Sequence, residues 1–194
     1  MKKTIENLTK AFIGESQARN RYSFYSKIAK REGFEQIAEV FLITAANEKE
    51  HASELFKMIS ELKGRIGEDM EEIIVEAVTP TTLSTTAKNL KAAIAGENYE
   101  HTTMYPEFAD VAEEEGLKEI AEQLRAIGMA EKHHEWRYKQ ILKQVEAGTV
   151  FKKDEEIKWV CRECGYVHEG KEPPKICPSC KHAKSYYQVK CEKF

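Results

Sequence analysis

Two short segments of the chain carry the same pair of metal-binding residue types at the same spacing. A glutamate precedes a histidine by three residues at Glu48 and His51, and again at Glu131 and His134. Residues three apart project from the same side of a helix. Both pairs lie on helical stripes that are otherwise apolar, where a carboxylate is costly unless it has a strong partner. The pattern therefore predicts buried side chains that hold metal ions.

An internal repeat joins these two segments. Residues 31–51 align with residues 114–134, and eight of the 21 positions are identical. The helix expected before each segment carries a further match, Gly14-Glu15 and Gly96-Glu97. Four converging carboxylates would repel one another unless cations lay between them. One glutamate from each of two helices, with Glu-x-x-His from each of the other two, is the arrangement of di-iron and di-manganese sites in helix bundles.

Glu100 has no counterpart in the first half of the repeat, because Ala18 stands at the matching position. It follows Glu97 by three residues and therefore faces the same way on a helix. We interpret Glu100 as a candidate seventh ligand on one side of the site. The alternative is a carboxylate that bonds one of the ligands or faces solvent.

Several other polar side chains lie near the expected ligands. Tyr22 and Tyr105 follow the first glutamate of each half by seven and eight residues. Each phenol could orient a carboxylate by a hydrogen bond, or could simply pack in the core. His101 and His133 are expected beside the site rather than in it. The acidic run at 113–115 is interpreted as solvated surface.

Two Cys-x-x-Cys pairs lie near the end of the chain, at Cys161 with Cys164 and at Cys177 with Cys180. Such pairs predict a tetrahedral site of four thiolates. The spacing does not separate zinc, which would be structural, from a single iron, which would carry one electron. Cys191 is left unpaired and is expected only to pack near this module.

Apolar residues recur at helical spacing over most of the chain before residue 148, which predicts a mainly α fold. Gly33, Gly116 and Gly148 suit left-handed positions just past helix ends. We expect four helices, at 4–31, 34–63, 82–114 and 117–146. Short connections predict two antiparallel hairpins, and the long connection over 64–81 predicts a crossover between them. The β-prone residues after a charged linker indicate a small module of the size that needs a metal to fold.

The composition excludes several other classes of protein. The 194 residues include 30 basic and 33 acidic side chains, giving a net charge of −3. Without a long basic patch, nucleic-acid binding has little support. Apolar runs are too short for a membrane span, and the start has no apolar signal segment, so we expect a cytoplasmic protein.

The chain resembles the rubrerythrin family in the segments AFIGESQARNRY, EKEH, AAIAGENYEHTTMYP, AEKHH, CRECGYVHEG and CPSC. The resemblance covers nearly the whole length. It implies a ferritin-like four-helix bundle over 1–147, a linker over 148–155 and a rubredoxin-like β module over 156–194. It also implies three iron ions per chain. The implied ligands of the two bundle irons are Glu15, Glu48, His51, Glu97, Glu100, Glu131 and His134, and those of the third iron are Cys161, Cys164, Cys177 and Cys180.

The resemblance further implies a peroxidase that reduces hydrogen peroxide to water in oxidative-stress defence. In the family pattern Glu48 and Glu131 bridge the irons, and one iron exchanges His51 for Glu100 as its oxidation state changes. The reaction needs two electrons and two protons, and two adjacent ferrous ions supply one electron each. The bundle ligands are then the catalytic residues, with Tyr22 and Tyr105 helping to manage protons.

The same resemblance implies redox partners. The cysteine-bound iron would pass on electrons from rubredoxin or from an NAD(P)H-dependent reductase. The chain has no Gly-rich nucleotide fingerprint, so that reductase must be another protein. The family forms homodimers in which the small module of one chain approaches the di-iron site of the other.

Two rival functions remain to be weighed. A ferroxidase or iron-handling relative would share the bundle but would not need a cysteine module that carries electrons. A zinc-ribbon interaction protein would share the cysteine module but would not need glutamate and histidine on a buried stripe. The visible spectrum separates these classes, because ferric thiolate is red and a zinc ribbon is colourless.

Overall fold

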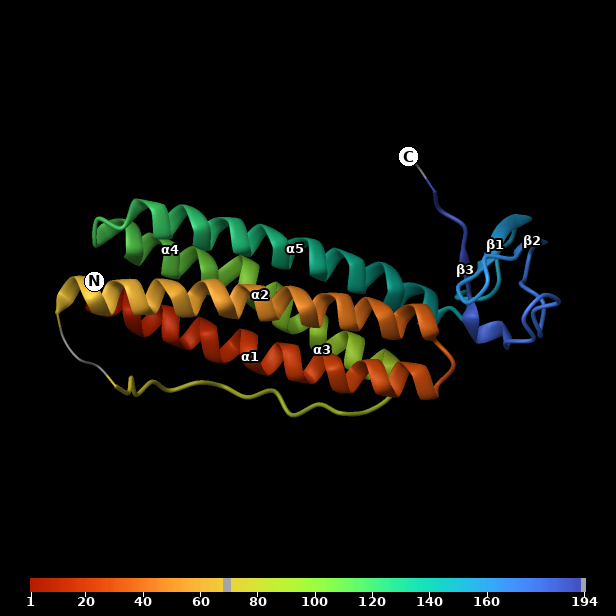
Figure 1. Cartoon of the computed structure of the whole chain (residues 1–194), viewed down its shortest axis with the longest axis horizontal. Helices are drawn as coiled ribbons and strands as arrows, with labels where there is room; N and C mark the ends of the chain where they lie inside the picture. Colours follow the sequence, from red (N-terminus) through yellow and green to blue (C-terminus); the bar gives the residue numbers. More distant parts are fainter. Residues whose placement is uncertain (68–70, 193–194) are drawn as a thin grey trace.

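The computed structural model describes residues 1–67 and 71–192 and contains a long helical bundle with a small β module at one end (Figure 1). The mainly α fold expected from the sequence is confirmed. The elements in chain order are α1 (Lys2–Arg31), α2 (Glu35–Ile66), α3 (Thr86–Tyr99), the π-helical turn η1 (Glu100–Met104), α4 (Tyr105–Glu114), α5 (Lys118–Glu146), β1 (Ile157–Cys161), β2 (Val167–Gly170), the 3₁₀ turn η2 (Lys184–Tyr186) and β3 (Tyr187–Val189).

The bundle consists of two helical hairpins. The first hairpin pairs α1 with α2, and the second pairs the α3–η1–α4 segment with α5 (Figure 1). Each hairpin turns at a left-handed glycine, Gly33 with φ 82° and Gly116 with φ 79°, as the sequence predicts. Residues 71–85 form no helix or strand and run back along the bundle to the start of α3 (Figure 1). The two hairpins are therefore joined by a crossover, as expected.

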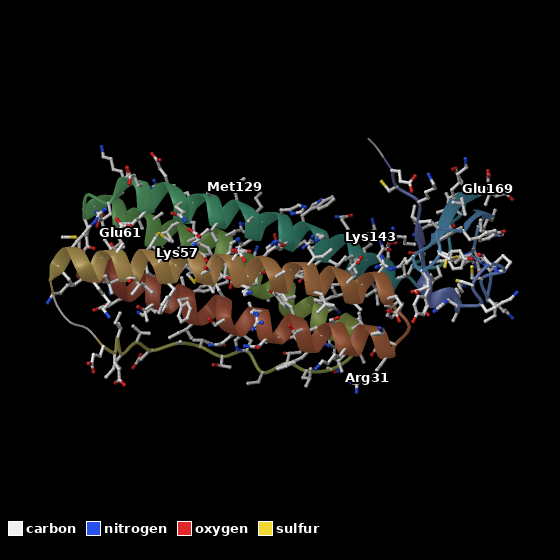
Figure 2. All side chains as sticks on the ribbon, viewed as in Figure 1. Arg31, Lys57, Glu61, Met129, Lys143 and Glu169 are labelled. Atoms are coloured by element: carbon white, nitrogen blue, oxygen red, sulfur yellow. The ribbon has the colours of Figure 1, made fainter. Side chains whose placement is uncertain are left out.

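Apolar side chains fill the bundle in two separate clusters. One contains Leu8, Leu55 and Leu124, and the other contains Tyr22, Phe41 and Tyr138. Charged side chains such as Lys57, Glu61 and Lys143 project outward along the helices (Figure 2). The buried carboxylates of the repeat fall between the two apolar clusters. Among the described residues, no helix combines the length and apolar content needed to cross a bilayer.

The third helix differs from the expected continuous helix over 82–114. It begins at Thr86, because the side chain of Asn89 bonds both the N–H (2.8 Å) and the carbonyl (2.9 Å) of Ser84 and holds that residue outside the helix. It is also interrupted by the π turn η1. Pro106, at the start of α4, lacks the N–H that would continue the α-helical ladder at this point. The second helix continues past Gly64 and ends at the left-handed Gly67.

The interpretation of residues 113–115 as solvated surface is wrong for Glu115. Its carboxylate accepts hydrogen bonds from the N–H (3.0 Å) and the hydroxyl (2.6 Å) of Thr4, and pairs with the amino terminus at 2.7 Å. Although partial burial opposes the shift, these contacts lower the pKa of Glu115 to about 2. The equivalent Glu32 accepts a bond from the N–H of Thr86 at 3.0 Å. Each hairpin thus caps the first helix of the other.

The small module is a three-stranded antiparallel sheet in the order β2-β1-β3. Trp159 forms its core, fully buried, and its indole N–H donates to the carbonyl of Gly170 at 2.9 Å. The module contacts the end of the bundle through an ion pair of 2.6 Å between Arg162 and Glu39. Nearby, the rings of Phe34 and Phe151 stack with centroids 6.2 Å apart.

Candidate metal centres

Four helices of the bundle each place a glutamate of the repeat at the same level of the core. Glu15 comes from α1, Glu48 from α2, Glu97 from α3 and Glu131 from α5, and each is at most 1% exposed. The histidines of the two Glu-x-x-His motifs lie one turn further along α2 and α5. The i, i+3 spacing therefore directs both residues of each motif into the bundle, as the sequence predicts.

The side chains form two overlapping groups whose ligand atoms all lie within 4.8 Å of one another. Both groups contain Glu48 and Glu131. Because two carboxylates are common to both groups, two cations held here would be neighbours with shared ligands. The first group is Glu15, Glu48, His51 and Glu131, and the second is Glu48, Glu97, Glu131 and His134.

The histidines face carboxylates from both hairpins. The Nδ1 atom of His51 lies 3.0 Å from Glu48 and 2.8 Å from Glu131. The Nδ1 atom of His134 lies 2.7 Å from Glu131 and 3.3 Å from Glu48. Each histidine therefore contacts the glutamate of its own motif and the glutamate of the other motif, so the two hairpins make equivalent contacts.

Several buried atoms of this cluster have no hydrogen-bond partner. They include one oxygen each of Glu15, Glu48 and Glu97, both oxygens of Glu131, and Nδ1 of His134. The short nitrogen–oxygen contacts to Glu131 lack the alignment of hydrogen bonds, so these atoms remain free to coordinate. Unsatisfied buried acceptors are costly, and cations between them would remove that cost. Carboxylate and imidazole ligands in a bundle core fit a pair of iron ions.

The pKa shifts of the cluster also fit a site that binds cations. Burial, with repulsion from Glu131, raises the pKa of Glu15 to about 8, and burial also holds the pKa of Glu97 well above its usual range. Burial opposes charge on His134, but the surrounding carboxylates outweigh it and raise its pKa to about 12. Without cations, protons therefore reduce the mutual repulsion. Metal binding at this cluster is coupled to proton release.

Two tyrosines bond the carboxylates across the hairpins. The hydroxyl of Tyr22 on α1 donates to Glu97 on α3 at 2.5 Å, and the hydroxyl of Tyr105 on α4 donates to Glu15 on α1. Both rings are also fully buried in the apolar clusters. The hydrogen bonds support the hypothesis that the phenols orient carboxylates, while the burial shows that they pack in the core as well.

Glu100 lies apart from the two ligand groups. It is the first residue of the π turn and is 8% exposed. Burial, followed by repulsion from Glu15 and other cluster carboxylates, raises its pKa well above the usual range. The structure therefore places Glu100 near the cluster but outside both four-residue groups.

His101 and His133 of the bundle lie outside the ligand groups, as expected. His133 stacks with Trp136, and Nε2 of His101 lies 3.1 Å from Glu135. Glu135, which also accepts a bond of 3.0 Å from Asn98, was missed by the sequence interpretation. No short spacing could have revealed the contacts of Glu135 with His101 and Asn98, because these partners are more than 30 residues apart in the chain.

The four cysteines of the module form a second site. Their sulfurs all lie within 4.8 Å of one another, with Cys161 and Cys180, like Cys164 and Cys177, 3.7 Å apart. The residue after each Cys-x-x-Cys pair is left-handed, and its N–H donates to the carbonyl of the first cysteine of the pair, at 2.8 Å from Gly165 to Cys161 and 3.0 Å from Lys181 to Cys177. The thiols are free, and together they fit one tetrahedral metal ion. Cys191 is exposed and lies outside this group.

A helical bundle with this carboxylate–histidine site, followed by a four-cysteine module, defines a ferritin-like di-iron protein that carries a rubredoxin-like domain. The family model Rubrerythrin matches residues 6–142, and the model of the rubrerythrin rubredoxin-like domain matches residues 159–188. The chain belongs to the rubrerythrin family. Members of this family are di-iron proteins of oxidative-stress defence.

Individual relatives match along nearly the whole chain. A rubrerythrin-family protein from Methanocaldococcus jannaschii is 64% identical and covers 100% of this chain and 96% of its own length. Rubrerythrin-1 of Clostridium acetobutylicum is 51% identical and covers 99% of this chain and 96% of its own length. The structure of fully reduced, all-ferrous nigerythrin aligns with a TM-score of 0.63 and 31% identity, covering 96% of this chain and 86% of that chain.

Proposed function

We propose that the protein is a di-iron peroxidase that reduces hydrogen peroxide to water. The observation that carries this proposal is the pair of ligand groups that share Glu48 and Glu131. When bound at these groups, two adjacent ferrous ions supply the two electrons that cleavage of the O–O bond requires. The cysteine module in the same chain supports a redox role over iron storage, which needs no electron carrier.

The ligands divide between the two ions according to the two groups. Glu15 and His51 would hold one ion, Glu97 and His134 would hold the other, and Glu48 and Glu131, which belong to both groups, would serve both ions. Glu100 would be a seventh ligand, taking the place of His51 at one ion when that ion is oxidised. An anionic oxygen suits a ferric ion, whereas a neutral imidazole suits a ferrous one.

The two tyrosines position the terminal carboxylates and hold protons close to the reaction. The hydroxyl proton of Tyr22 lies on the bond to Glu97, and that of Tyr105 lies on the bond to Glu15. Each proton can pass from the phenol oxygen through its carboxylate as water is formed. The apolar clusters on either side of the carboxylates exclude bulk water and so keep the electrostatic interactions strong.

Electrons reach the bundle from the four-cysteine site, which would hold a third iron. Cys164 is exposed, and this edge supports exchange of electrons with a protein donor such as rubredoxin or an NAD(P)H-dependent reductase. The module contacts Glu39, nine residues before Glu48, which corresponds to about 14 Å along the helix. A homodimer in which the module of one chain approaches the bundle site of the other would shorten that path. Free cysteines suit the reducing cytoplasm.

The test uses the full chain reconstituted anaerobically with iron. We expect close to three irons per chain, the red colour of ferric thiolate, and consumption of hydrogen peroxide when NAD(P)H, a reductase and rubredoxin are supplied. In Cys177→Ser, the chemically reduced protein should still consume peroxide once but should not turn over with the protein donor. Fully loaded, reduced protein that leaves peroxide intact would refute the proposal, and accumulation of a ferric mineral would favour the ferroxidase alternative.

A further inference from the structure

A groove on the bundle leads from the surface to Glu100. It has a volume of about 630 Å³ and lies between α1 and the α3–η1–α4 segment, beneath part of the crossover. Glu100 lines this groove and is the only one of the proposed ligands that does so. The other lining side chains include Lys10, Gln17 and Arg21 from α1, Met104 and Phe108 from the second hairpin, and Val78 from the crossover.

Two glycines form part of the groove wall. Gly14 and Gly96 both line it, and they immediately precede the ligands Glu15 and Glu97. Both lie inside helices, where glycine is the least favourable residue apart from proline. A Cβ atom added at either position would meet nothing within 4 Å. Neither glycine is therefore required by close packing, and a side chain at either position would occupy the groove itself.

Gly128, in the same bundle, is a glycine that close packing does require. A Cβ atom at Gly128 would lie 3.2 Å from the Cβ of Tyr105, so this glycine allows α5 to approach the second hairpin closely. The contrast with Gly14 and Gly96 is clear, because their missing side chains leave open space. Both positions therefore leave open space along the groove wall.

We propose that this groove is the access route by which small hydroperoxides reach the di-iron site from the Glu100 side, with Gly14 and Gly96 setting its width. The proposal rests on the peroxidase function proposed above. A hydroperoxide ROOH takes up two electrons from the reduced site and two protons, its O–O bond breaks, and ROH and water leave by the same path. The apolar part of the wall, with Met104 and Phe108, suits neutral molecules such as hydrogen peroxide and small alkyl hydroperoxides.

Two other hollows of the bundle do not reach the ligands. One of about 420 Å³ lies between α1 and α2 and is lined by side chains such as Phe12, Ser16 and Phe56. Another of about 380 Å³ is lined by His101, Tyr105 and Gly128. Among these three hollows in the described part of the chain, only the groove at Glu100 is lined by a proposed ligand.

The first test narrows the groove without disturbing the ligands. The test variants are Gly96→Ala and Gly96→Leu, and the control variants are Gly64→Ala and Gly64→Leu. Gly64 is a suitable control because it also lies in a helix with open space at its Cβ position but lines none of the three hollows. In iron-loaded, chemically reduced full-length protein, Gly96→Leu should slow the reaction with hydrogen peroxide about tenfold. The loss should be smaller for Gly96→Ala and larger with tert-butyl hydroperoxide. The Gly64 variants should react as the parent protein does.

The second test measures access without turnover. Binding of azide to the oxidised iron-loaded protein is followed by its visible spectrum. A narrower access route should slow association and dissociation by the same factor in Gly96→Leu and leave the Kd unchanged. Iron content should equal that of the parent protein, and the thermal midpoint of the metal-free variant should not fall.

The outcomes separate the access route from the proposed function. Parent protein that does not consume peroxide refutes the peroxidase, while the azide rates of Gly96→Leu still decide the route. Azide and peroxide rates equal to those of the parent protein would overturn the access route and leave the peroxidase standing. A changed azide Kd with unchanged association would also overturn it, because that result indicates an altered site rather than an altered path.

Discussion

The two helical hairpins of the bundle carry equivalent ligands but are not equivalent in backbone. The repeat offset is 82 residues at Glu15 and Glu97 but 83 residues at Tyr22 and Tyr105. The second hairpin therefore contains one extra residue between its first glutamate and its tyrosine. The π turn Glu100–Met104 absorbs that residue, since a wider turn keeps the following helix in phase with the core.

The two hairpins share the candidate metal ligands but differ at the π turn. The first glutamate and the Glu-x-x-His motif of each hairpin together make up the two ligand groups. The π turn has no counterpart in α1, and it begins at Glu100, where the first hairpin has Ala18. An approximately symmetric repeat thus provides two candidate ligand groups, and the π turn with Glu100 makes the two hairpins differ beside them.

The largest expected effect comes from removing a carboxylate that both ligand groups share. Glu131→Ala should abolish binding of both bundle irons, because each group loses a ligand and the balance of charge. Iron content should fall from about three to about one per chain, and peroxide consumption should fall at least about 100-fold. Elemental analysis and a peroxide assay measure these changes, with the exposed Glu122→Ala on the same helix as the control. Retention of two bundle irons would contradict shared ligation.

The next effect removes the difference between the hairpins. Glu100→Ala makes the second hairpin resemble the first, which has Ala18 at this position. Six ligands remain, so the protein should still hold two ferrous ions, while peroxide turnover should fall roughly 10- to 100-fold. Steady-state peroxide reduction and iron content are measured together, and Glu100→Gln tests whether charge is required. Full turnover with full iron in both variants would return Glu100 to the role of a bystander carboxylate.

A smaller effect is expected from removing the two tyrosine hydroxyls, each of which bonds a carboxylate of the opposite hairpin. Tyr22→Phe and Tyr105→Phe each remove one hydrogen bond between the hairpins and keep the ring that packs in the core. Each should slow peroxide reduction by about tenfold at unchanged iron content, because a carboxylate ligand loses its orienting donor. Stopped-flow rates over a range of pH measure the effect. The buried Tyr25, which bonds the backbone of Thr82 instead, provides the control variant Tyr25→Phe.

If only one of the two tyrosine variants were slow, the hairpins would differ in proton handling as well as in the π turn. If neither were slow, the phenols would serve only to pack the core. The first result would show that the two hairpins differ, but only the second contradicts an orienting role for the tyrosines.

The smallest effect concerns the carboxylates that cap the opposite hairpin. Glu32→Gln and Glu115→Gln should each lower the free energy of unfolding by about 1 kcal/mol. The pKa of Glu115 is about 2 when folded, below its ordinary value of 4.5, so its contribution is present above about pH 4.5 and is lost as the pH falls through about 2. Urea denaturation at pH 7 and at pH 3 measures both effects. A Glu115→Gln variant with the parent's acid sensitivity would contradict the assignment.

The candidate ligands could be identified from the sequence because each motif is local. Glu48 and His51 are three residues apart on one helix turn, and the cysteine pairs are equally close, so spacing alone brings their side chains together. The glycines at Gly33 and Gly116 were recognised for a similar reason, because each residue alone determines the backbone at its turn. The repeat then indicated that the two halves would converge on one site.

The sequence also contains a signal for the π turn, although we expected a continuous helix there. The change of offset from 82 to 83 between Glu97 and Tyr105 is the signal of an inserted residue. Pro106 is a second signal, since proline interrupts the α-helical ladder. Periodicity averaged over a whole helix does not detect a shift of one residue, which explains the error.

The sequence by itself determined the types of candidate ligand, their spacing within each helix, the repeat and the separate cysteine module. Tertiary structure alone decided the contacts between distant segments: the bond from Tyr22 to Glu97, the pairing of His101 with Glu135, and the capping of Thr4 by Glu115. These depend on how two hairpins pack, and helix packing fixes positions that no local spacing encodes. The same packing leaves open the groove that reaches Glu100, because two glycines on different helices contribute to one wall.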